Sequence, residues 1–205
     1  MKIPMTSPKR TSPKRTSPIG SLLAVLFAAL LFSPATSAAA ADWKLDPGKS
    51  TLGFSGTQTG AAFQGRFSNY SAVIAFDPDH LEKSHIDVTV DLASAATGDT
   101  QRDTALPAKD WFDVAEFAQA KFDADAIRRT SAGSYEAAGK LTLRGVTRPF
   151  VLPFTLDVDG ATAHAKGHAD LLRNEFGVGQ GPWSSGQWVA LEVGVDLDIV
   201  ATRSN

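Results

Sequence analysis

The sequence predicts an all-β domain of eight antiparallel strands behind an N-terminal export signal. Apolar residues recur at every second position in several segments, which is typical of strands with one buried and one solvated face. Short stretches rich in Gly, Pro, Asp and Ser separate most of these segments, so neighbouring strands are expected to run antiparallel. One long interval has a helix-like start, which adds a short helical or loop insertion to the fold.

The first 41 residues have the composition of a signal peptide. They contain no acidic residue and five basic ones, which are Lys2, Lys9, Arg10, Lys14 and Arg15. The apolar run at residues 21–32 is shorter than the roughly 20 residues that cross a bilayer, and small residues follow it up to Asp42. We therefore expect cleavage before Asp42 and a periplasmic domain, residues 42–205, with no membrane span. An uncleaved membrane anchor is the alternative.

The charge of the mature chain excludes one class of partner. Removing residues 1–41 takes away five of the 20 Lys and Arg residues and leaves 15 against 22 Asp and Glu, so the net charge falls from −2 to −7. An acidic domain is poorly suited to bind nucleic acid. The sequence has no Cys, which excludes disulfides, thiol catalysis, c-type haem attachment and anchoring through an acylated cysteine.

The predicted strands differ in the clarity of their alternation. The clearest are residues 86–92, 150–158 and 189–199, and weaker patterns bounded by turn residues predict strands at residues 51–57, 65–76, 120–127, 135–143 and 162–172. Residues 145–147 are expected to form a tight connection, and the intervals 99–117 and 174–187 are too long for one. Eight such strands fit either a β-sandwich or a closed up-and-down barrel, and periodicity does not distinguish them.

The histidines do not form a recognisable metal motif. His164 and His168 are four residues apart, but they lie in a predicted strand, where that spacing separates them by roughly 13 Å. No metal site is therefore expected there, and His80 and His85 are placed in a solvated connection. The chain also lacks a nucleophile elbow and a phosphate-binding loop. With no nucleophile, base and orienting group in one pattern, we expect a binding protein and no catalytic residues.

Several blocks of sequence occur in the order and spacing of a known family. Residues 43–54 are similar to the motif Trp-x-x-Asp-x-x-x-Ser-x-x-x-Phe, residues 139–148 to Gly-x-Leu-Thr-x-x-Gly-Val-Thr, and residues 173–177 to Arg-x-x-Phe-Gly. Shorter matching blocks are Gly65-Arg66-Phe67, Gln101-Arg102-Asp103 and Trp111-Phe112-Asp113. Together the blocks resemble the YceI family of exported lipocalin-like proteins. One departure is Ala105, which stands where the family often has a His.

This resemblance implies an eight-stranded antiparallel lipocalin-like β-barrel whose apolar interior holds an isoprenoid lipid, such as an isoprenoid quinone or a polyprenyl phosphate. It implies no catalytic residue and no covalent cofactor. The expected lining residues are Phe54, Phe67, Phe122, Phe154 and Phe176. Trp111, Phe112 and Trp183 are expected near an entrance.

Two arginines, Arg102 and Arg173, are the candidates for a polar head group, because the planar guanidinium binds phosphate bidentately. Ion pairs with neighbouring acids are the alternative for both. Four glycines in or beside strands are candidates for clearing space for the lipid tail, and these are Gly53, Gly65, Gly139 and Gly167. The same aromatic residues would alternatively fill a closed core.

Two other functions stay open at this point. Residues 176–183 resemble the branch of the family found beside membrane b-type cytochromes, so the barrel could instead be a non-catalytic interaction module for such a cytochrome or another electron-transfer partner. An enzyme that acts on an apolar substrate is the third alternative. The sequence leaves the oligomeric state open, a homodimer included.

Overall fold

The computed structural model describes residues 40–204, so the predicted signal peptide lies almost wholly outside the described residues. Within them the chain forms eleven strands: β1 Ala41–Leu45, β2 Thr51–Gln58, β3 Ala61–Phe67, β4 Tyr70–Phe76, β5 His85–Asp91, β6 Ala95–Ala96, β7 Gln119–Ser131, β8 Ser134–Leu143, β9 Val146–Asp159, β10 Thr162–Leu172 and β11 Glu192–Arg203. The helices are α1 Thr100–Ala105 and five short 3-10 helices: η1 Pro47–Lys49, η2 Leu81–Lys83, η3 Leu92–Ser94, η4 Arg173–Phe176 and η5 Gly181–Trp183.

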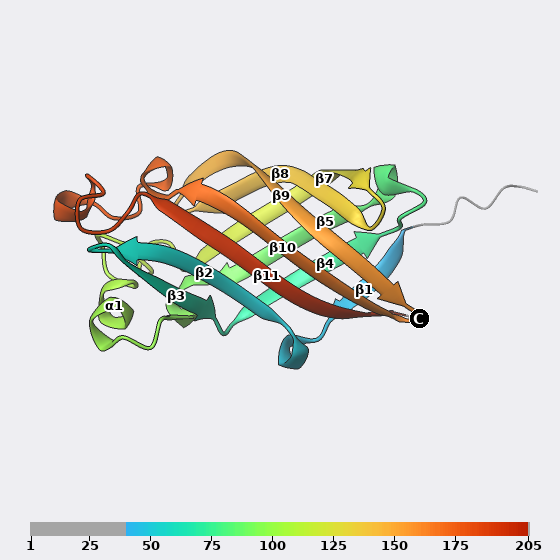
Figure 1. The fold of residues 1–205 in the computed structure, drawn as a ribbon, viewed down its shortest axis with the longest axis horizontal. Helices are drawn as coiled ribbons and strands as arrows, with labels where there is room; N and C mark the ends of the chain where they lie inside the picture. The colour runs from blue at the N-terminus through green and yellow to red at the C-terminus, as the bar shows by residue number, and fades with distance from the viewer. Residues whose placement is uncertain (1–39, 205) are drawn as a thin grey trace, which may run out of the picture. The chain divides into compact units, whose positions relative to one another are not determined.

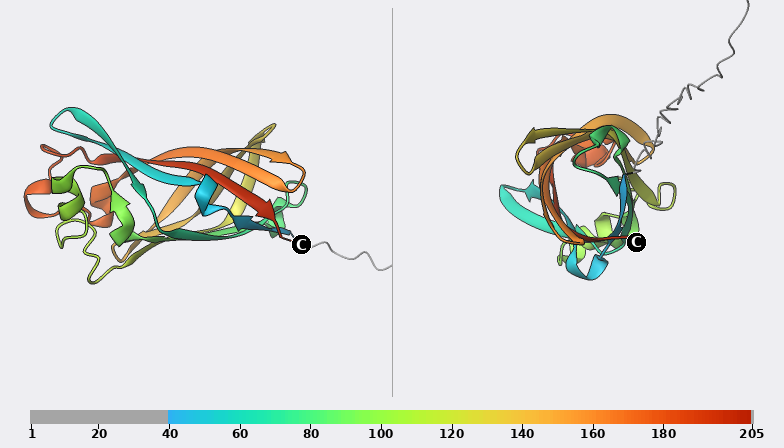
Figure 2. Two further views of the ribbon diagram at one scale, coloured as in Figure 1. Left: turned by 90° about the horizontal axis from the view of Figure 1, so that it is seen from below. Right: turned by 90° about the vertical axis from the view of Figure 1, so that its right-hand side faces the viewer.

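The eleven strands form only eight walls of one closed barrel, because three of the walls consist of two consecutive strands each and the other five of a single strand. The first wall is β1 with β2, which both pair with β11, and the second is β3 with β4, which pair with β2 and β1. β5 and β6 form the third wall. The ring then continues in chain order from β7 to β11, and every pairing is antiparallel. Seen end-on, the strands close into a continuous ring (Figure 2).

The predicted fold class is confirmed, and the barrel rather than the sandwich is the correct alternative. All eight predicted segments coincide with a wall, although the predicted strand 65–76 is in fact interrupted between β3 and β4. Sequence analysis missed β1, which is only five residues long. The tight connection expected at residues 145–147 is instead a turn at Arg144 and Gly145, with φ of 49° and 72°, and β9 has already begun at Val146.

Glycine allows a neighbour to approach closely at two strand positions, and this corrects the idea that strand glycines make room for a ligand tail. A Cβ atom at Gly65 would lie 2.3 Å from the ring of Phe54, so that ring already occupies the free space. At Gly139 a Cβ atom would lie 2.0 Å from the carbonyl oxygen of Asp123 on β7. The other two candidate glycines likewise face backbone oxygens of neighbouring strands. These glycines serve strand packing.

The two long intervals cover one end of the barrel, and β1 begins near the other (Figure 1). The helix-like start expected at residue 99 is confirmed, because Asp99 caps α1 by accepting hydrogen bonds from the backbone N–H groups of Gln101 and Arg102. The intervals are joined where the N–H groups of Gly179 and Gln180 donate to the carbonyl oxygen of Asp110 over 2.8 and 2.7 Å. We call these two intervals, residues 99–117 and 174–187, the cap.

Candidate functional site

The barrel interior contains a cavity of about 280 Å³. Every wall of the barrel contributes to its lining, as do four residues of the cap, Leu106, Trp111, Phe112 and Val178. The alternation of each strand explains this lining, since successive side chains point to opposite faces and the apolar set points inwards. Among all lining residues only Ser55, Tyr70 and Arg173 are polar or charged apart from the tryptophans. The cavity is therefore suited to an apolar ligand.

Seven of the ten predicted ligand-binding residues line this cavity. They are Phe54, Phe67, Trp111, Phe112, Phe122, Phe154 and Arg173. The other three, Arg102, Phe176 and Trp183, are not among the lining residues. The structure therefore brings most of the predicted set together around one space, while contact of any of them with a ligand stays a prediction.

The lining aromatics pack against one another in two groups. Towards the cap, the ring of Phe67 lies 5.2 Å from that of Phe54 and 6.2 Å from that of Phe112. Towards the opposite end, the lining residue Phe154 stacks on Tyr135, which is buried but does not itself line the cavity, with ring centroids 5.5 Å apart. Such tilted and stacked pairs hold the rings in fixed orientations. They give the cavity aromatic walls at both ends.

Arg173 is buried, with 2% of its surface exposed, and it organises the cap. Its Nε donates to the carbonyl oxygen of Ala190 over 2.9 Å. Its Nη1 donates to Val178 and Gly179, and its Nη2 to Trp183 and Val189, all through backbone carbonyl oxygens at 2.6–3.4 Å. All five guanidinium N–H groups thus have acceptors within the chain. The acceptors are backbone carbonyl oxygens, so Arg173 does not form the ion pair with a neighbouring acid that was the alternative from the sequence. Contact of Arg173 with a head group stays a prediction.

This burial also changes the acid–base behaviour of Arg173. Loss of hydration disfavours the charged guanidinium and lowers its pKa from the usual value. The ring of Trp111 lies over the guanidinium, with its centroid 5.3 Å from Cζ, which is a favourable cation–π geometry. Arg173 therefore places a positive charge at the cap end of the cavity while its hydrogen-bond donors are already used.

Arg102 occupies a different position, on α1 at the edge of the cap. Its Nη1 donates to Oε1 of Gln58 over 3.0 Å and its Nε to Oγ1 of Thr97 over 3.2 Å. Its Nη2 lies 3.8 Å from a carboxylate oxygen of Asp99, which is an ion pair but too long for a hydrogen bond. Its side chain is 28% exposed, and Nη2 has no hydrogen-bond acceptor among the described residues, so Arg102 keeps unused donors.

Phe176 and Trp183 support the cavity from behind the lining. Phe176 is 3% exposed and packs in the buried cluster of the cap. The Trp183 ring lies 5.7 Å from that of Trp111, and the Trp183 carbonyl oxygen accepts a hydrogen bond from Arg173. Trp183 therefore holds Trp111, which does line the cavity, against the guanidinium.

Tyr70 is a lining residue that sequence analysis missed. Its hydroxyl is buried and has no hydrogen-bond partner among the described residues, and burial raises its pKa above 10.0. It is therefore a neutral donor that lacks an acceptor, next to an apolar space. The only signal in the sequence was a Tyr at the start of an alternating segment, which is equally typical of packing.

The histidines lie outside the cavity. His164 contacts Asp198, and Nδ1 of His168 donates to a carboxylate oxygen of Asp196 over 2.7 Å, so each has its own acidic partner across β10 and β11. His80 pairs with Asp77 over 3.0 Å. The placement of His85 in a loop was wrong, because His85 is the first residue of β5.

Comparison with known proteins places the chain in a family. A family profile described as YceI-like domain matches residues 43–201. A UPF0312 protein of Pseudomonas savastanoi pv. phaseolicola is 32% identical over 182 residues, which cover 84% of this chain and 94% of that protein. The protein YceI of Escherichia coli O6:H1 is 33% identical over 135 residues, which cover 64% of this chain and 70% of that protein.

Solved structures show the same barrel. BcnA of Burkholderia cenocepacia superimposes with a TM-score of 0.75 at 33% identity, covering 77% of this chain and 99% of that chain. A polyisoprenoid binding domain from Saccharophagus degradans, implicated in plant cell wall breakdown, superimposes with a TM-score of 0.65 at 15% identity, covering 80% and 99%. The second match shows the fold alone. From the matched residues, the related sequences and the shared barrel, we conclude that this chain belongs to the YceI family.

Proposed function

We propose that this barrel is an exported, non-catalytic binding protein that holds an isoprenoid lipid, either a polyprenyl phosphate or an isoprenoid quinone, for transport or storage. The observation that carries the proposal is the apolar cavity to which all eight walls contribute. The similar domain from Saccharophagus degradans is described as polyisoprenoid-binding, and family membership supports a ligand of the same class here.

The chemistry of the lining favours a hydrocarbon chain over a polar metabolite. Each methylene-sized unit that moves from water into such a cavity contributes about 0.8 kcal/mol. A polar ligand would lose its hydrogen bonds with water and find few replacements, which costs roughly 1–3 kcal/mol for each unpaired group. The volume of about 280 Å³ lies just below the ~300–1,000 Å³ typical of small-molecule sites, so a long tail must displace side chains or extend beyond the cavity.

Two residues are suited to meet the polar part of the ligand. Arg102 lies at the cap edge with unused donors on Nη2, and a guanidinium is well suited to a phosphate. Tyr70 offers an unpaired hydroxyl beside the cavity, which a carbonyl or phosphate oxygen would satisfy. Arg173 contributes its charge and its hold on the cap. We therefore assign direct head-group contact to Arg102 and Tyr70 and a positioning role to Arg173.

The lining also supports a non-catalytic function. Among residues 40–204, no Asp, Glu, His or Lys lines the cavity, and these are the residue types that most often serve as general acids and bases. The described residues contain no helix that is long and apolar enough to span a membrane. Export rests on residues 1–41, of which residues 1–39 lie outside the described residues.

Lipid extraction and native mass spectrometry of the protein from the periplasmic fraction test this proposal. We expect one isoprenoid lipid per chain, and N-terminal sequencing should begin at Asp42. Delipidated protein should take up a polyprenyl phosphate or an isoprenoid quinone again. The absence of both a co-purified lipid and any uptake would overturn the binding function. If deletion of the gene then impaired membrane redox activity, the interaction-module alternative would replace it.

A further inference from the structure

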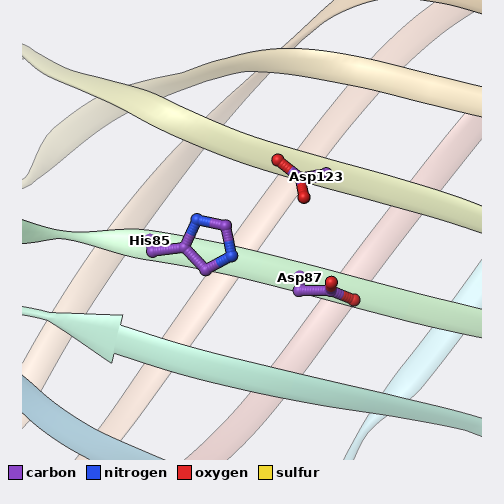
Figure 3. A group of neighbouring side chains, drawn as sticks. All are labelled: His85, Asp87 and Asp123. Carbon is purple, nitrogen blue, oxygen red and sulfur yellow. The ribbon is translucent and has the colours of Figure 1, made fainter.

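Three side chains with metal-ligating atoms meet on the outside of the barrel, away from the cavity. His85 and Asp87 come from β5 and Asp123 comes from the neighbouring strand β7 (Figure 3). One ligand atom from each lies within 4.8 Å of the others. The alternation of the strands explains their position, because Ile86, Val88 and Phe122 between and beside them point into the cavity.

The pairing of β5 with β7 brings the two carboxylates together. Asp87 and Asp123 are direct partners in the antiparallel register, and like charges at such positions are destabilising. Lys140 faces Asp123 across β8 and Lys121 lies two residues before it. Neither lysine forms an ion pair with the cluster, because its Nζ does not lie within 4.0 Å of a carboxylate oxygen of Asp87 or Asp123. Asp125, two residues further along β7, adds a negative charge.

We propose that His85, Asp87 and Asp123 form a surface site for one divalent transition-metal ion, with Zn²⁺ as its representative. One imidazole and two carboxylates are a donor set for borderline ions such as Zn²⁺, whereas Ca²⁺ requires six to eight oxygen ligands. Zn²⁺ holds its nitrogen and oxygen ligands at about 2.0–2.2 Å, so two ligands of one ion lie up to about 4 Å apart. Small side-chain rotations would therefore close the site, and water would complete the coordination.

An ion in this site would remove the repulsion between the carboxylates of the two paired strands. The two opposed carboxylates would both be attracted to the cation instead of repelling each other, so β5 and β7 would be held together at the outer face. Since the inner face of the same strands lines the cavity, metal binding would stiffen one wall of the barrel without contacting its contents. Binding to the native state alone raises thermal stability by mass action.

Isothermal titration calorimetry of the metal-free purified protein with ZnCl₂, together with thermal unfolding, tests the proposal. We expect one bound ion per chain and a Tm increase of about 5–10 °C at a hundredfold excess over Kd. His85→Ala and Asp123→Asn should each weaken binding about tenfold or more. Titration with Co²⁺ should give a visible absorption band that is lost in His85→Ala.

Two control variants make the result specific. His168→Ala removes another surface imidazole with acidic neighbours, and Glu192→Gln removes an exposed carboxylate from β11; both should bind Zn²⁺ as the parent protein does. Circular dichroism establishes that each variant is folded. The proposal is overturned if the parent protein shows neither binding heat nor a Tm increase. It is equally overturned if His85→Ala and Asp123→Asn bind as tightly as the parent.

Discussion

Gly179 leaves the space that the guanidinium of Arg173 occupies: a Cβ atom at position 179 would lie 1.9 Å from Nη1 of Arg173. Gly179 also has a φ of +82°, a conformation that favours glycine. Gly179→Ala should therefore lower the free energy of unfolding by about 3 kcal/mol, measured by urea denaturation. Gly181→Ala is the matched control, because its φ is +57° but nothing lies within 4 Å. Equal losses in the two variants would mean that the contact with Arg173 contributes nothing.

Replacement of Arg173 by lysine should be among the most destabilising conservative changes in the chain. Lysine keeps the charge but cannot reach five carbonyl oxygens, so several buried acceptors would lose their partners at about 1–3 kcal/mol each. We expect Arg173→Lys to cost at least about 3 kcal/mol in urea unfolding. Arg66→Lys, on the exposed face of β3, should change stability little. A small effect at Arg173 would contradict its role in organising the cap.

Tyr70→Phe should stabilise the ligand-free protein while weakening ligand binding. Removing a buried hydroxyl that has no partner should raise the free energy of unfolding by about 1 kcal/mol. A ligand that offers an acceptor to this hydroxyl should bind less tightly to the variant, as measured by fluorescence titration of delipidated protein. Tyr135→Phe, whose hydroxyl is not among the unpaired buried groups, serves as the control. If affinity for both lipid classes is unchanged, Tyr70 does not meet the head group.

Filling the cavity should prevent lipid binding without opening the barrel. Ala165 on β10 lines the cavity, and Ala165→Phe would place an aromatic ring in that space, so the amount of co-purified lipid should fall at least severalfold. Ala138→Phe introduces the same ring on β8 at a position outside the cavity lining and should leave lipid content unchanged. Extraction followed by mass spectrometry measures both. Equal lipid content in the two variants would show that the ligand lies elsewhere.

His168 should make stability depend on pH near neutrality. Its hydrogen bond to Asp196 raises its pKa above the usual 6.5, with a further contribution from Asp170. The native state therefore holds the proton more tightly than the unfolded state. The resulting stabilisation is complete below about pH 6.5 and is lost as the pH rises through the raised pKa.

The expected size of this effect is below about 1 kcal/mol, because half of the side chain is exposed to solvent. Urea denaturation of the parent protein and of His168→Ala between pH 5.5 and pH 8.5 measures it. The stability difference between them should shrink as the pH rises, and a difference that grew with pH would contradict the assignment. Asp196→Asn should remove most of the same pH dependence.

The strands could be predicted from the sequence because each wall has one apolar face, and turn residues mark where most walls end. The choice of a barrel over a sandwich came from the resemblance to the YceI family. The two-residue break between β3 and β4 and the short strand β1 were missed, since each involves too few residues to change a periodic pattern. Aromatic lining residues such as Phe54 and Phe154 could be predicted for the same reason as the strands: they occupy inward positions.

The partners of the polar side chains could not be predicted from the local sequence. The acceptors of Arg173 are backbone carbonyls that the cap folds around it, so the residue types nearby give no sign of them. The cluster of His85, Asp87 and Asp123 likewise depends on the register between β5 and β7. A register is set by pairing across the sheet, and one strand alone cannot reveal it.

The pairing of β1 with β11 has a consequence for how the protein acquires its cavity. Trp43 and Arg203, near the two ends of the described chain, are partners in the pairing that closes the ring. Such a contact between distant parts of the chain forms slowly and late in folding. The ring therefore closes only when β11 has paired with β1, and the proposed lipid would be enclosed as the barrel closes around it.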